Sequence, residues 1–206
     1  MRLYSQVIFP RLLDLSMSSE SLTAYRRDVL ARAKGQVLEI GFGTGLNLPY
    51  YPTAVEKLTA IDVNPGMTAI ANRRIARAPF PVERITLDGE SLLMADESFD
   101  TVVSTWTLCS IANVAQALQE AQRVLKPSGE LLFIEHGLSP EQKVEVWQHR
   151  LNGVQKTFAD GCNLNRNIAQ LVENASFSVT QLECFYAEGV PKFLGYFYKG
   201  VAEKPC

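Results

Sequence analysis

Short apolar segments alternate with amphipathic helical patterns along almost the whole chain, and this alternation limits the fold more than any other feature. Val102 and Val103 form the centre of one segment, a near-continuous apolar run that suits a parallel strand covered on both faces. Strands that alternate with helices of about 10 to 15 residues are typical of right-handed crossovers and of a parallel sheet between two helical layers. We expect such strands at 37–40, 58–61, 82–87, 99–105 and 131–135.

Capping residues place the helices between these strands. Ser18 or Ser19 can cap a first helix that ends before Gly35, and Asn64 with Pro65 begins the next one. The later helices are expected at 114–124, capped by Asn113, at 139–158, with Trp147 in a core-facing stripe, and at 166–175, capped by Asn165. Two final strands, 179–185 and 193–202, resemble a closing hairpin. The sequence therefore predicts an α/β fold with a doubly wound, mostly parallel seven-stranded sheet closed by an antiparallel C-terminal hairpin.

Length, charge and cysteine content narrow the class of protein. A chain of 206 residues can bury one substantial core, so we expect a single domain, with 1–35 as a helical lid segment and 36–206 as the catalytic core. A net charge of -2 gives no basic surface for nucleic acid. Four dispersed cysteines favour a reducing cytoplasm over a disulfide framework, and no apolar run is long enough for a transmembrane segment. We expect a monomer or a weak homodimer.

In open α/β sheets the ligand binds at the carboxyl ends of the strands, so the residues that follow each strand are the first candidates for a site. These are Gly41, Gly43 and Gly45, Asp62, Asp88 and Gly89, Thr105 and Trp106, and His136.

The glycine loop has the pattern E-x-G-x-G-x-G, from Glu39 to Gly45. Glycines let the backbone bend tightly and touch a ligand directly, although an ordinary tight turn would also use them. The nicotinamide pattern G-x-G-x-x-G does not match, because Leu46 stands at its last glycine position. Asp62, about 20 residues further on, can accept hydrogen bonds from two ribose hydroxyls, or it can simply cap the turn before Asn64.

Residues 37–135 resemble a class I S-adenosylmethionine-dependent methyltransferase with a Rossmann-like fold. The resemblance covers the segments 39–45, 62, 87–90, 98–103 and 123–130. It implies that the loop glycines and Glu39 bind the methionine and ribose part of the cofactor and that Asp62 holds the ribose. It also implies that Asp88 and Gly89 bind the adenine, and that Thr105 and Trp106 lie beside the methyl group. The product would be S-adenosylhomocysteine. Leu87-Asp88-Gly89 departs from the family's commoner Gly-Asp-Ala order.

A narrower resemblance rests on the segments 105–111, 135–137 and 160–166. They are similar to bacterial relatives of the methyltransferase-like 7 group, whose animal members are linked to thiol S-methylation. This similarity implies a small-molecule acceptor and narrowly favours a thiol. A quinone-like ring carbon, a phospholipid amine and a hydroxylated metabolite stay open as acceptors, as do a cofactor-binding module without turnover and a dehydrogenase.

Methyl transfer from a sulfonium mainly requires that the acceptor be positioned and that water be excluded. His136 is a candidate base or orienting contact, or else a structural histidine, and Asp160 could orient an imidazole or a substrate amine, or form a turn. Cys162 could contact a soft substrate, or pack. Arg166, in a helix first turn, would need a partner, and an internal one is favoured. No metal site is expected, because the histidines and Cys162 lack compact ligand spacing.

Overall fold

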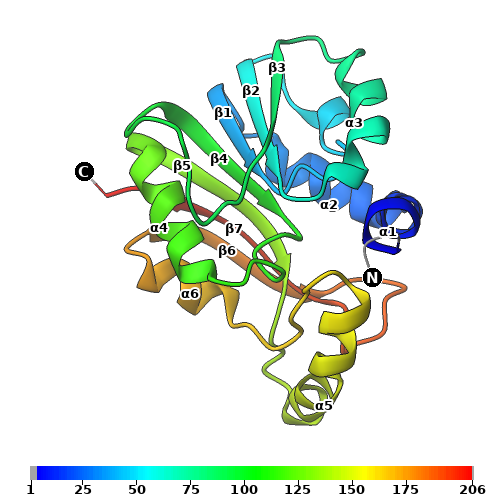
Figure 1. The fold of residues 1–206 in the computed structure, drawn as a ribbon. Helices are drawn as coiled ribbons and strands as arrows, with labels where there is room; N and C mark the ends of the chain where they lie inside the picture. The colour runs from blue at the N-terminus through cyan, green and yellow to red at the C-terminus, as the bar shows by residue number, and fades with distance from the viewer. Residues whose placement is uncertain (1–3, 206) are drawn as a thin grey trace.

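The computed structural model describes residues 4–205 and contains one seven-stranded sheet with the strand order β3-β2-β1-β4-β5-β7-β6 (Figure 1). Strands β1 to β5 pair in parallel, and β7 runs antiparallel to both β5 and β6. The strands are β1 (Gly35–Ile40), β2 (Val55–Asp62), β3 (Val82–Thr86), β4 (Phe99–Thr105), β5 (Leu125–His136), β6 (Ser178–Tyr186) and β7 (Tyr196–Glu203). The predicted fold class is confirmed, including the C-terminal hairpin.

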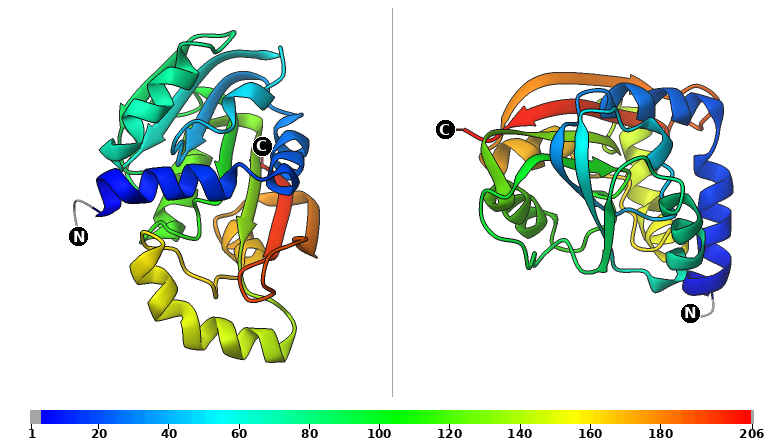
Figure 2. Two further views of the ribbon diagram at one scale, coloured as in Figure 1. Left: turned by 90° about the vertical axis from the view of Figure 1, so that its right-hand side faces the viewer. Right: turned by 90° about the horizontal axis from the view of Figure 1, so that it is seen from above.

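Helices cover both faces of this sheet, as alternation predicts. On one face α4 (Val114–Val124) and α6 (Ile168–Asn174) pack their apolar side chains on β1, β4 and β5. On the other face α2 (Glu20–Leu30) and α3 (Thr68–Ile75) form a second core cluster (Figure 2). The two clusters bury most residues of the central strands β1, β4 and β5, which explains their near-continuous apolar sequence.

The N-terminal segment lies across the carboxyl ends of the strands rather than on either face. It consists of a π-helical turn (Tyr4–Ile8) and α1 (Phe9–Met17), and Figure 2 shows α1 crossing in front of these ends. A short 3-10 turn (Pro65–Met67) comes directly before α3. At its start the Asn64 side chain accepts a hydrogen bond from the Gly66 N–H, as the predicted capping role of Asn64 requires. A second 3-10 turn spans Leu48–Tyr50.

Helix α5 (Gln142–Phe158) corrects one prediction. It was expected to cover the sheet with Trp147 in the core, but it extends beyond the carboxyl ends of the strands (Figure 1), and the Trp147 side chain is 54% exposed. Val154 and Phe158 on the same helix are also exposed. The amphipathic pattern correctly predicts a helix, but it does not specify what the apolar stripe of that helix contacts.

A second correction concerns the cap of α6. This helix begins at Ile168 with Asn167 as the N-cap, whose side chain accepts from the Gln170 N–H, whereas Asn165 was expected as the cap. Asn165 instead contacts the His149 ring. Arg166 therefore precedes the helix, and its guanidinium donates to the Leu108 carbonyl, an internal partner as favoured.

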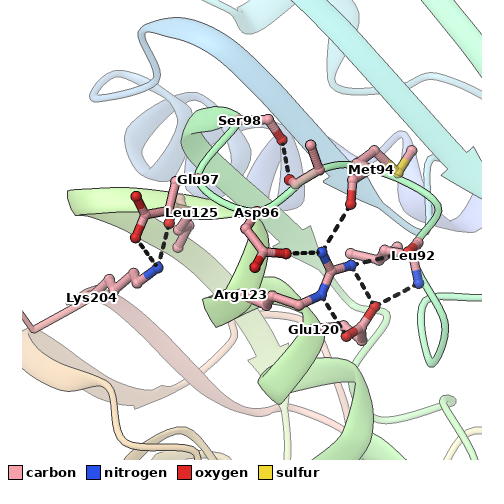
Figure 3. A network of polar contacts seen from close by, with 10 residues as sticks. Leu92, Met94, Asp96, Glu97, Ser98, Glu120, Arg123, Leu125 and Lys204 are labelled. Carbon is pink, nitrogen blue, oxygen red and sulfur yellow. Dashed lines mark hydrogen bonds and ion pairs between the residues drawn. The ribbon is translucent and has the colours of Figure 1, made fainter.

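The loop between β3 and β4 is held by one side chain from α4. Figure 3 shows the Arg123 guanidinium bonded to the Asp96 and Glu120 carboxylates and to the carbonyl oxygens of Leu92 and Met94. These contacts fix the loop that begins at the end of β3. Within residues 4–205, every helix is too short or too polar to cross a membrane.

Candidate active site

A cavity of about 1080 Å³ opens at the carboxyl ends of the parallel strands. Its walls come from the segments that follow β1, β2, β3, β4 and β5, and α1 covers part of it. All the predicted site residues except Gly45 line it: Glu39, Gly41, Gly43, Asp62, Asp88, Gly89, Thr105, Trp106, His136 and Asp160.

The glycine loop after β1 needs the left-handed backbone that only glycine adopts cheaply. Gly41, Gly43 and Gly45 have φ values of 78°, 56° and 80°. A Cβ on Gly41 would lie 2.0 Å from the Thr107 Oγ1, whereas a Cβ on Gly43 would meet no described atom within 4 Å. Gly41 therefore permits close packing inside the protein, while Gly43 leaves open space beside the cavity.

Asp62 at the end of β2 holds this loop in place. One carboxylate oxygen accepts from the Gly43 N–H at 2.7 Å, and the other accepts from the Asn64 N–H at 2.7 Å. Burial raises the pKa of Asp62, and these two backbone hydrogen bonds partly oppose that rise. Each oxygen keeps a free lone pair, so the carboxylate can accept further hydrogen bonds from a ligand.

Glu39 lies buried at the end of β1, and its contacts are internal. Its carboxylate accepts from the Asn47 Nδ2 at 2.8 Å and from the Tyr51 hydroxyl at 2.7 Å. Burial raises the pKa of Glu39 to about 8, against the effect of those two donors and of the nearby Arg26. Glu39 thus fixes Asn47, whose Nδ2 also donates to the Thr105 Oγ1 at 3.0 Å.

Three buried polar atoms beside the cavity have no hydrogen-bond partner among the described residues: Arg26 Nε, Trp106 Nε1 and Asn47 Oδ1. Arg26 is 3% exposed, and its guanidinium lies 5.0 Å from the Trp106 ring centroid. Buried groups of this kind usually have a partner, so the unpaired atoms point to a ligand. The methionyl end of S-adenosylmethionine fits them, because its carboxylate needs the two donors and its ammonium needs the acceptor.

The residues after β3 are less enclosed. Asp88 is exposed, and one of its oxygens accepts from the Glu90 N–H at 2.7 Å. Gly89 is buried, and a Cβ there would lie 3.0 Å from the Ile40 Cγ2. The unusual order Leu87-Asp88-Gly89 thus places the small residue where β1 comes closest. The assignment of these two residues to adenine stays a prediction.

The loop after β4 is anchored by Glu135, a residue that the sequence analysis did not select. Its buried carboxylate accepts from the Ser104 hydroxyl at 2.8 Å and from the N–H groups of Thr107 at 2.9 Å and Cys109 at 3.4 Å. Trp106 in this loop has a φ of 52°, a strained backbone for a bulky residue. Glu135 therefore fixes the backbone of Thr107 and Cys109, in the loop that carries Trp106.

His136 is 7% exposed, and its imidazole faces two cysteines. The Cys162 Sγ lies 3.4 Å from the His136 Nε2 and 3.3 Å from the Cys109 Sγ. Hydrogen bonds from Cys109 and then His136 lower the pKa of Cys162 to about 4, although burial opposes the shift. The same contact with Cys162, together with burial, raises the pKa of Cys109. Cys109 was not predicted as a site residue, although it lies in the segment 105–111 that carries the narrower resemblance.

Asp160 lines the cavity but does not contact His136. Its carboxylate accepts from the Ser5 hydroxyl at 3.2 Å and from the Asn64 Nδ2 at 3.3 Å. Its φ of 47° and the following Gly161 form the turn considered as the alternative. Asp160 therefore joins the end of α5 to the N-terminal segment. The predicted catalytic role of Asp160 stays a prediction.

Comparisons with known proteins identify the family of the chain. A family described as a methyltransferase domain matches residues 38–133. The thiol S-methyltransferase TMT1B of Rattus norvegicus is 37% identical over 180 residues, which are 85% of this chain and 68% of that relative. The thiol S-methyltransferase TMT1A of Homo sapiens is 37% identical over 154 residues, which are 73% of this chain and 63% of that relative. A SAM-dependent methyltransferase structure from Methanosarcina mazei has a TM-score of 0.66 at 20% identity, and the match covers 85% of this chain and 95% of that one.

The fold and the loop held by Asp62 define this protein as a class I S-adenosylmethionine-dependent methyltransferase. The predicted enzyme class and cofactor are confirmed. Within that class, the chain belongs to the group of the thiol S-methyltransferases TMT1A and TMT1B.

Proposed function

We propose that this enzyme transfers the methyl group to the sulfur of a small, largely apolar thiol. The observation that carries the proposal is a cluster of two thiols and an imidazole in the same cavity as the glycine loop. It consists of Cys109, His136 and Cys162, whose polarisable side chains suit contact with a sulfur acceptor. Apolar side chains supply much of the remaining wall, among them Phe9, Leu12, Val190, Leu194 and Phe197. The thiol S-methyltransferase relatives add independent support.

The chain's residues divide the work of binding and positioning. Asp62 and the Gly43 backbone would hold the ribose side of the cofactor, and Arg26, Trp106 and Asn47 would hold its methionyl end. S-adenosylmethionine, when bound, supplies a methyl group already activated by a sulfonium. The acceptor sulfur then forms the new bond to the methyl carbon, while the old carbon–sulfur bond breaks and its electron pair stays on the departing sulfur. The acceptor thiol loses its proton to solvent before transfer, which is feasible near neutral pH for a thiol of pKa about 8.5.

The N-terminal segment is proposed to act as the lid over this reaction. Tyr4 donates to the Phe158 carbonyl at 2.9 Å, and Ser5 contacts Asp160, so the start of the segment is joined to the end of α5. The segment would exclude water from the acceptor and narrow the cavity to small substrates. Of the two predicted catalytic residues, His136 is proposed to face the acceptor together with Cys162, and Asp160 to act through the lid. Cytoplasmic location and a monomer or weak dimer stay predictions.

A matched acceptor series tests the proposed function. The purified enzyme with radiolabelled cofactor would be given thiophenol, phenol and aniline, which differ only in the accepting atom, and each methylated product would be identified by mass spectrometry. We expect label on the thiol sulfur at the highest kcat/KM of the series. Methylation of the phenol or the aniline in preference to the thiol would contradict the proposal, while leaving the methyltransferase class intact.

A further inference from the structure

Three buried side chains from distant parts of the chain meet at the wall of the cavity. Cys109 follows β4, His136 ends β5, and Cys162 follows α5. The possible ligand atoms of these three residues all lie within 4.8 Å of one another. The sequence predicts no metal site because these residues are not compactly spaced along the chain, but the fold brings them together.

The distances within this cluster are close to those of a tetrahedral zinc site. Bonds of about 2.3 Å to sulfur and 2.0 to 2.1 Å to nitrogen place two sulfur ligands ~3.8 Å apart and a sulfur and a nitrogen ~3.5 Å apart. The observed separations are 3.3 Å between the two sulfur atoms and 3.4 Å between the Cys162 Sγ and the His136 Nε2. The His136 Nδ1 lies 3.7 Å from the same Sγ, so a turn of the imidazole together with small rotations of the two cysteines would bring all three side chains onto one ion.

The backbone around the cluster is already fixed. Glu135 accepts from the Cys109 N–H, and Asn163 donates to the Cys109 carbonyl from both its backbone N–H and its Nδ2, each at 2.9 Å. The Asn163 contacts tie the loop that carries Cys162 directly to the loop that carries Cys109. Metal ligands held by neighbouring hydrogen bonds in this way lose little freedom on binding.

The surrounding charges suit a divalent cation with two thiolates. Such a centre has no net charge when the third ligand is a neutral imidazole. The half-buried Arg166 and the buried Glu135 carboxylate, one of each sign, lie in the same electrostatic neighbourhood. While the open position holds no anion, such a neutral centre adds no uncompensated buried charge.

We propose that Cys109, His136 and Cys162 bind one soft divalent cation, Zn²⁺ or an ion of similar chemistry, with the fourth coordination position open toward the cavity. Three protein ligands with one open position is the arrangement of catalytic rather than structural zinc sites. Resting on the proposed function, we further infer that the acceptor thiol occupies the open position as a thiolate. The ion would lower the pKa of the bound thiol, whose proton would pass to solvent as the acceptor enters, and would hold the sulfur for attack on the methyl carbon. His136 would then act as a ligand.

Cobalt substitution tests the site without any turnover. The full-length protein, reduced with a phosphine and stripped of metal, would be titrated with Co²⁺, whose thiolate charge-transfer absorption reports cysteine ligation directly. Zn²⁺ competition and elemental analysis would give affinity and stoichiometry. We expect one ion per chain and strong charge-transfer absorption. Absence of saturable binding, or saturable binding without thiolate absorption, would overturn the proposal.

Substitution of each proposed ligand tests where the ion binds. Loss of an outer-sphere partner alone costs about 10- to 100-fold in affinity, so Cys109→Ser, Cys162→Ser and His136→Ala should each weaken Zn²⁺ binding by more than about 100-fold. The matched controls are Cys184→Ser and His149→Ala, because both side chains are exposed and lie outside the cavity lining. Unchanged binding in variants of the cluster that still bind S-adenosylmethionine would also overturn the proposal. The wild-type cobalt spectrum decides the question if these variants fail to fold.

The two proposals can fail separately. If Co²⁺ binds with thiolate absorption but only phenols or amines are methylated, the metal site stands and thiol methylation falls. If thiols are methylated at full rate by metal-free protein, thiol methylation stands and the role of the ion falls. Addition of thiophenol to the cobalt protein, without S-adenosylmethionine, should shift the spectrum if the thiolate takes the open position. An unchanged spectrum would refute that step.

Discussion

Gly43 and Gly41 have different surroundings. Substitution of Gly43 should therefore mainly affect cofactor binding, and substitution of Gly41 should mainly affect the stability of the fold. A methyl group on Gly41 would collide with Thr107, while one on Gly43 would project into space that no described atom fills. We expect Gly43→Ala to cost only about 1 to 2 kcal/mol of stability, from the left-handed backbone, yet to weaken cofactor binding by about tenfold or more.

Gly41→Ala is the matched variant, and it should lose clearly more stability because of the added overlap. Urea unfolding and calorimetric titration with S-adenosylmethionine measure the two effects. If Gly43→Ala bound the cofactor as the wild type does, the open side of that glycine would not be the cofactor side.

Glu39 makes stability depend on pH in an unusual direction. Its ordinary pKa of 4.5 rises to about 8 in the folded protein, because burial removes water from the carboxylate. The folded state therefore binds a proton that the unfolded state releases, so this contribution is complete below pH 4.5 and is lost as pH rises toward 8. Between pH 5 and 8 the wild type should lose about 4 kcal/mol through this group.

Glu39→Gln should remove that part of the pH dependence, since a neutral amide can still accept from Asn47 and contact Tyr51. Urea unfolding of both proteins at several pH values provides the comparison. Parallel stability curves for the two proteins would show that Glu39 is ionised in the fold throughout this range.

At the scale of elements, the apolar runs in the sequence predict every strand that the structure describes, but the helical patterns do not predict what each helix packs against. Strand β5 begins at Leu125 rather than at 131, because the segment through Pro127 still pairs irregularly with β4. The stripe of α5 was assigned to the core, yet Trp147 is exposed. Periodicity records which side chains share a face, whereas contact depends on where the preceding loop directs the helix.

The same limit applies to the site. Residues that follow strands were found because parallel strands end at one edge. Arg26 comes from α2 and Asn47 from the far side of the glycine loop, and neither carries a local pattern. Cys109 lies in the segment 105–111, but the resemblance of that segment does not say which of its side chains faces the cavity. Such residues reach the cavity only through tertiary packing, so a single sequence contains no signal for them.

Arg123 shows how one residue of α4 stabilises a whole loop. Its guanidinium satisfies two carboxylates and two carbonyls at once (Figure 3), a set that the single ammonium of lysine cannot reproduce. We expect Arg123→Lys to lower the free energy of unfolding by about 2 kcal/mol, as measured by urea denaturation. Arg73→Lys on α3, where the side chain is exposed, serves as the control. Equal stability of the two variants would mean that solvent replaces these contacts without loss.

At the scale of the whole molecule, one side chain on α1 links the N-terminal segment to the cofactor loop. Asp14 accepts from the Thr44 hydroxyl at 2.6 Å and from the Arg74 guanidinium at 2.6 Å. Arg74 also donates to the Thr44 carbonyl, so α1, α3 and the glycine loop meet at one point. Burial alone would raise the pKa of Asp14, but hydrogen bonds from Arg74 and Thr44 outweigh it and lower the pKa. The Asp14 carboxylate therefore stays ionised near neutral pH.

Loss of the contacts between Asp14, Thr44 and Arg74 should free α1 from the strand ends without unfolding the sheet. The reason is that α1 contributes little to either core cluster. We expect Asp14→Ala to speed dissociation of S-adenosylmethionine by about tenfold, on the scale of losing charge-assisted hydrogen bonds. Stopped-flow displacement measures that rate, and hydrogen exchange over residues 9–17 should accelerate with it while exchange in β1 and β4 stays slow. Arg11→Ala, an exposed change on the same helix, should alter neither quantity. Faster exchange in α1 with an unchanged dissociation rate would show that the segment covers the cavity without controlling passage of the cofactor.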